Sequence, residues 1–169
     1  MSETVAAPML GRRLLAPVAD GFAIAGGLVL VAAILVTVAS VVAARFGAPI
    51  LGNTEIVEMA AGVAIAFFLP ICQLRGGNVI VDFFTTRVPP RVRDGLDAVM
   101  TFLFALVVAV LTWRLIVGGI NAADRNRVSM FLALPQWWGY AAAACAMVLW
   151  TAVCFYTAVE ALMRARAPR

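Results

Sequence analysis

Long apolar runs separated by short polar segments make up most of this chain. Four runs reach the roughly 20 residues that a helix needs to cross a ~30 Å hydrocarbon core. They cover about residues 18–44, 55–74, 96–120 and 137–163. Backbone groups in lipid must hydrogen-bond within their own segment, so each run should be a helix. The pattern predicts an all-α, integral membrane four-helix bundle over residues 18–163, between tails at residues 1–17 and 164–169.

A shorter amphipathic segment lies between the second and third runs. Residues 78–88, with the sequence NVIVDFFTTRV, are too short to span a bilayer and too apolar for an ordinary loop. We expect them to form a helix in the cytoplasmic membrane interface. Arg87, Arg91 and Arg93 would then contact anionic phospholipid headgroups.

The polar segments at the other ends of the runs predict two outer loops. Residues 45–53 are rich in turn-forming residues, and Glu55 follows in a first helical turn, where the helix dipole favours a negative charge. Gly118, Gly119 and Asn121 are expected to end the third span. An aromatic belt at the outer interface is expected from Trp137, Trp138 and Tyr140.

The arginines set the expected orientation. All thirteen basic residues are Arg; nine lie in the two tails and the central segment, three lie in the two outer loops, and Arg114 lies within a span. Cytoplasmic loops carry an excess of positive residues, so both termini should be cytoplasmic.

Composition excludes several classes of function. The chain is 64% hydrophobic, against roughly 45–50% for a soluble domain, and it contains no His. The absence of His removes His-ligated metals and Ser-His-Asp triads. Cys72, Cys145 and Cys154 lie within apolar runs and suit small buried hydrophobes. We therefore expect no catalytic residues, cofactor, metal or nucleic-acid partner.

Two charges fall inside the expected spans. Glu58 and Arg114 should lie at similar depths in the outer half of the membrane, where an unpaired charge costs about 2.5–3.5 kcal/mol. We predict an ion pair between them, with Glu55 as the substitute partner. In one interpretation these charges form a structural pair or contact another subunit, and in the other Glu58 is a transport carboxylate. Asp20 and Glu160, near the cytoplasmic ends, should be solvated or paired.

Residues 18–163 resemble a known family of membrane subunits. The run Arg75-Gly-Gly-Asn-Val-Ile-Val-Asp82 is similar to the R-x-G-H-I-x-V-D pattern of the small, DctQ-like permease subunit of tripartite ATP-independent periplasmic (TRAP) transporters. Pro135 and Trp137, ahead of the last span, also fit. Arg75, Gly77, Asn78 and Asp82 are the candidate motif residues, and Asn78 stands where the family commonly has His.

The resemblance implies a non-enzymatic scaffold role in a bacterial inner membrane. In such systems a periplasmic substrate-binding protein delivers an organic anion, such as a carboxylate, to a large membrane subunit. That large subunit carries the substrate and sodium sites and drives sodium-dependent uptake. This chain, a multi-pass membrane protein, would support it.

Two other functions remain open at the level of sequence. A small four-helix proton-coupled exporter would use Glu58 as its exchanging carboxylate. A cofactor-free membrane anchor subunit of another complex would need no polar site at all. An enzyme of lipid metabolism is disfavoured because Asp82, Asp94 and Asp97 lack a metal-binding spacing.

Overall fold

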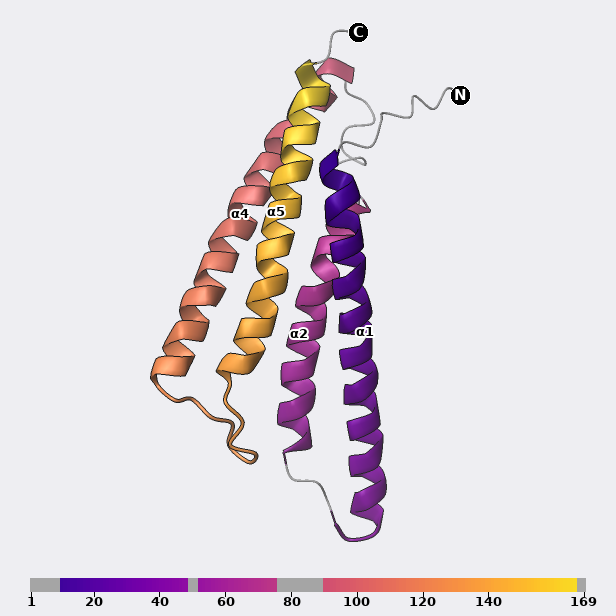
Figure 1. Cartoon of the computed structure of the whole chain (residues 1–169), viewed down its shortest axis with the longest axis vertical. Coiled ribbons are helices and arrows are strands. Elements are labelled where there is room, and N and C mark those ends of the chain that lie inside the picture. The colour runs from indigo at the N-terminus through magenta and orange to yellow at the C-terminus, as the bar shows by residue number, and fades with distance from the viewer. Residues whose placement is uncertain (1–9, 49–51, 76–89, 167–169) are drawn as a thin grey trace.

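Four long helices account for nearly all of the described chain. The structure, a computed structural model, describes residues 10–48, 52–75 and 90–166. The helices are α1 (Leu10–Arg45), α2 (Asn53–Leu74), α4 (Pro90–Asp124) and α5 (Trp137–Arg166) (Figure 1). Each contains a segment that is long and apolar enough to cross a membrane. The all-α fold of a multi-pass membrane protein is therefore confirmed.

The helix ends differ from the expected spans mainly in α1 and α4. α1 begins at Leu10, before the expected span, and α4 continues to Asp124. Gly118 and Gly119 do not end α4; they lie within the helix, where α5 approaches closely. An added Cβ on Gly119 would lie only 3.0 Å from Tyr140 Cβ on α5.

The predicted interfacial helix lies outside the described residues. Residues 78–88 belong to this part, as do Gly77, Asn78, Asp82 and Arg87 among the candidate motif and headgroup residues. Arg91 and Arg93 lie in the first turn of α4, and their side chains are likewise outside the description.

The helices form two hairpins that lie side by side. In Figure 1 their order across the molecule is α4, α5, α2, α1. Extensive packing joins α4 to α5, α5 to α2, and α2 to α1, with a smaller contact between α1 and α5. We call the end where α1 begins and α5 ends the terminal end, and the opposite end the loop end.

Small apolar side chains fill the helix contacts. Ala105 and Val108 of α4 pack against Cys154 and Ala158 of α5. A second cluster joins Ala19, Leu74 and Val153, which come from α1, α2 and α5. Lipid tails are as apolar as these side chains, so close packing rather than hydrophobicity stabilises the contacts.

Hydroxyl and amide groups add hydrogen bonds between helices. Thr112 Oγ1 on α4 and Thr151 Oγ1 on α5 are 2.8 Å apart. Gln73 Nε2 on α2 donates to Thr157 Oγ1 on α5 at 3.2 Å. Such bonds between membrane helices contribute about 0.6 kcal/mol each on average. They tie α5 to both of its neighbours.

The contact between α1 and α2 depends on a glycine. A Cβ added at Gly26 would lie 2.9 Å from Phe67 Cβ and 3.3 Å from the Ala64 carbonyl oxygen. The Phe22 ring packs edge-on against the Phe67 ring, with centroids 5.0 Å apart. A Cβ added at the adjacent Gly27 meets nothing within 4 Å.

We therefore expect Gly26→Ala to be less stable than Gly27→Ala. Both changes gain about 1 kcal/mol of helix propensity, but only the first forces α1 away from α2, at a cost of about 1–3 kcal/mol. Thermal unfolding of the two variants in detergent measures the difference. Equal midpoints would show that the backbones are not in close contact at Gly26.

Candidate functional site

A groove opens at the loop end between α2 and α4. It encloses about 650 Å³, and α5 forms its floor. We call it the loop-end groove. Its lining includes Glu55, Glu58, Gly62, Leu115, Gly139 and Ala143. Acidic and small side chains therefore lie together at this end of the molecule.

The loop between α4 and α5 closes the end of the groove. Val128 and Pro135 form an isolated antiparallel bridge, and the Ser129 amide donates to the Leu134 carbonyl at 2.9 Å. Ala133, in the tight turn, has a φ of 50°, a left-handed conformation that side chains rarely adopt. The loop is thus folded back on itself, with residues 129–134 forming its tip.

Glu55 holds this tip against α2. Its Oε1 accepts hydrogen bonds from the amides of Met130 at 2.7 Å and Phe131 at 3.1 Å, and its Oε2 accepts one from Leu132 at 3.2 Å. Backbone amides that have no helix or sheet partner need acceptors, and a carboxylate can satisfy several at once. Glu55 therefore binds the loop amides and is not the ion-pair partner of Arg114.

Contacts between neighbouring helices show how deep Glu58 and Arg114 lie along the length of the bundle. An added Cβ on Gly139 would lie 2.8 Å from Met59 Cγ, and one on Gly119 would lie 3.0 Å from Tyr140 Cβ. Gly139 and Tyr140 are consecutive, so Met59 on α2 is at about the same level as Gly119 on α4. In Figure 1, α2 also reaches further toward the loop end than α4.

The expected ion pair between Glu58 and Arg114 is not formed in the structure. Arg114 is five positions before Gly119 and Glu58 is one position before Met59, which together place Arg114 ~9 Å deeper than Glu58 at 1.5 Å per residue. In addition, α5 lies between α2 and α4. Both side chains are exposed, and an ion pair between Arg75 and Asp20 lies at the other end of the molecule.

That ion pair joins Arg75 to α1. Arg75 Nη2 lies 3.3 Å from Asp20 Oδ1, with both side chains largely exposed. Arg12 Nη2 donates to the Leu74 carbonyl oxygen at 3.3 Å. The last carbonyls of a helix lack internal partners and attract cations. Arg12 therefore satisfies a carbonyl at the terminal end of α2, and Arg75, which begins the candidate family motif, joins that end to α1.

A second cavity, of about 270 Å³, lies beside these arginines. Arg12, Arg75, Asp97 and Glu160 contribute charges of both signs to its lining. Within the described chain, no group of three or more His, Cys, Asp or Glu side chains is placed to hold a metal ion.

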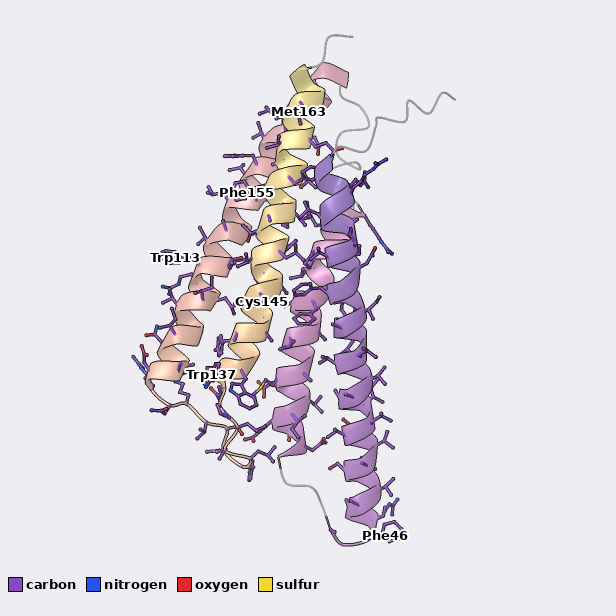
Figure 2. All side chains as sticks on the ribbon, in the orientation of Figure 1. Phe46, Trp113, Trp137, Cys145, Phe155 and Met163 are labelled. Atoms are coloured by element: carbon purple, nitrogen blue, oxygen red, sulfur yellow. The ribbon has the colours of Figure 1, made fainter. Side chains whose placement is uncertain are left out.

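The three expected belt aromatics separate into two roles. Trp137 and Trp138 are exposed, with ring centroids 6.0 Å apart, at the loop end of α5 (Figure 2). Tyr140 is half-buried and packs against Gly118 and Gly119 of α4. A membrane-interface role remains a prediction for the two tryptophans.

A family model described as "Tripartite ATP-independent periplasmic transporters, DctQ component" matches residues 33–164. The chain belongs to this family. The match covers α2, α4, α5 and the later part of α1, so it includes both hairpins. No curated protein and no solved structure matches the chain.

Membership confirms the resemblance and assigns the chain to a transporter component rather than an enzyme. It is the small subunit of a TRAP transporter. Among the motif residues of this DctQ component, Arg75 is described with its contacts, and its contact with Asp20 joins α2 to α1.

Sequence reasoning did not find the contact between Glu55 and the loop amides. Glu55 is separated by 75 residues from Met130, the first of its amide donors. A glutamate in a first helical turn already has a local explanation in the helix dipole, so nothing local points to a distant partner. The hydrogen bond between Thr112 and Thr151 was likewise not predicted, because no local pattern in the sequence connects the two residues.

Removing the Glu55 carboxylate should release the loop tip of the DctQ component. In Glu55→Gln we expect the amides of residues 130–132 to exchange with solvent about tenfold faster, since a hydrogen bond to a charged acceptor is stronger than one to a neutral amide. Hydrogen exchange read by mass spectrometry measures this. Glu58→Gln is the matched control, and unchanged exchange in Glu55→Gln would contradict the contact.

The contact between Arg75 and Asp20 should contribute little to stability. Their side chains are 75% and 51% exposed, and exposed ion pairs typically contribute about 0–1 kcal/mol. A double-mutant cycle of Asp20→Asn and Arg75→Gln, read from thermal unfolding, should give a coupling free energy below about 1 kcal/mol that falls with added salt. A coupling above about 2 kcal/mol would mean that the pair is shielded from water.

Proposed function

We propose that this chain is the scaffold subunit of a sodium-driven TRAP transporter for an organic anion such as a carboxylate. A periplasmic substrate-binding protein delivers the anion, and a large membrane subunit carries it across the membrane. The family match over residues 33–164 is the observation that carries the proposal.

The helices support a scaffold role. Secondary transporters commonly build their substrate and ion sites from interrupted helices near the middle of the membrane. The four described helices run without interruption through their apolar segments. The described intramembrane charges, Glu58 and Arg114, are separated by α5 and form no joint site. The substrate and sodium sites therefore belong to the large subunit.

We place the terminal end in the cytoplasm and the loop end in the periplasm of a bacterial inner membrane. Nine arginines on the terminal side and three on the loop side support this orientation. Arg87, Arg91 and Arg93 would then meet anionic headgroups, and the binding protein would approach the loop that Glu55 holds.

One observation favours the proton-coupled exporter as a second candidate. Glu58 lines an open groove and has no ion-pair partner in the described chain, as an exchanging carboxylate would require. The family match gives this candidate no support. It therefore serves as the specific alternative that an experiment must exclude.

Affinity purification separates the two candidates. The tagged chain, expressed in its own host and extracted in mild detergent, should recover one large, many-spanning membrane protein in about equal amount, identified by mass spectrometry. A homodimer alone, binding cationic solutes with a pH dependence that Glu58→Gln removes, would overturn the scaffold proposal.

A further inference from the structure

The loop-end groove exists because of the order of the helices. α5 packs against both α2 and α4, so the α2 and α4 surfaces beside it are left apart. Gly139 and Ala143 of α5 line the groove together with Gly62 of α2. Small residues in a membrane helix surface allow another helix to approach closely.

Gly62 has no packing reason within this chain. A Cβ added there meets nothing within 4 Å, whereas one added at Gly139 would lie 2.8 Å from Met59 Cγ. Glycine is the least favourable residue in a helix interior apart from proline, so its use at an exposed position needs an explanation. Close approach of a second backbone from outside the chain supplies one.

Glu58 shares this surface of α2. It precedes Gly62 by one helical turn, and Ile65 follows on the same face, with 62% of its surface exposed. Acyl chains cannot neutralise a carboxylate, and charged residues in membrane helices pair with opposite charges. No cation within the described chain pairs with Glu58.

We propose that the loop-end groove receives a membrane helix of the large subunit, which approaches at Gly62 and places a basic side chain opposite Glu58. This inference rests on the proposed function, which supplies the partner. A second copy of the chain fits less well. Its Arg114 would lie ~9 Å deeper than the Glu58 that it would have to face.

Reversing the charge of Glu58 and adding a larger side chain at Gly62 provide the first test. The tagged chain is expressed together with the large subunit, and the recovered large subunit is quantified. Glu58→Arg and Gly62→Leu should each lower recovery at least about tenfold, because breaking a buried charge pair or its close packing weakens association strongly. Asp124→Arg and Gly27→Leu, at exposed or open positions outside the groove, should stay within about twofold.

Photo-crosslinking provides a second test that does not depend on altered folding. A photoreactive residue replaces Ile65 beside the groove or Ile34 on α1, which are 62% and 60% exposed. Ile65 should crosslink to the large subunit, and Ile34 should not.

The outcomes separate the two proposals. If the wild-type chain recovers no large subunit, the proposed function fails. If it recovers the large subunit but the groove variants match their controls, or Ile65 crosslinks only to lipid or to a second copy, the groove proposal alone is overturned.

Discussion

The two contact surfaces of α5 determine how the rest of the molecule is arranged. One surface packs Cys154 and Ala158 against α4, and the other packs Val153 against α1 and α2. Between helices in lipid there is little hydrophobic driving force, so association depends on close fit and a few hydrogen bonds. Small residues and threonines on α5 provide both. With α5 in the middle, α2 and α4 remain apart, and the groove that carries Glu58 follows from this separation.

Hydropathy was sufficient to predict the helices. It did not predict how each helix is rotated about its own axis or how far the helices are shifted along one another. The spans at about residues 55–74 and 137–163 agree closely with α2 and α5. Gly118 and Gly119 were expected to end a helix because glycine often follows the last turn of one. The sequence does not show that Tyr140 packs on them. Likewise, Glu58 and Arg114 looked level when counted along separate spans. The offset between α2 and α4 only becomes visible from side-chain contacts.

The candidate site was predictable only where a local rule applied. Arg75 was singled out by a short motif, and its contact with Asp20 gives that position a structural role. The three loop amides that donate hydrogen bonds to Glu55 come from a turn far along the chain. No local pattern in the sequence connects that turn to α2. The sequence gives no reason to single out Gly62, because only the structure shows that the space around it is open.

In the proposed scaffold role, this chain supports transport by another subunit and does not transport by itself. Uptake of the anion into proteoliposomes tests it most directly, with an imposed sodium gradient and the purified binding protein present. We expect uptake only when this chain and the large subunit are reconstituted together. Sodium-independent solute movement by this chain alone, lost in Glu58→Gln, would contradict it.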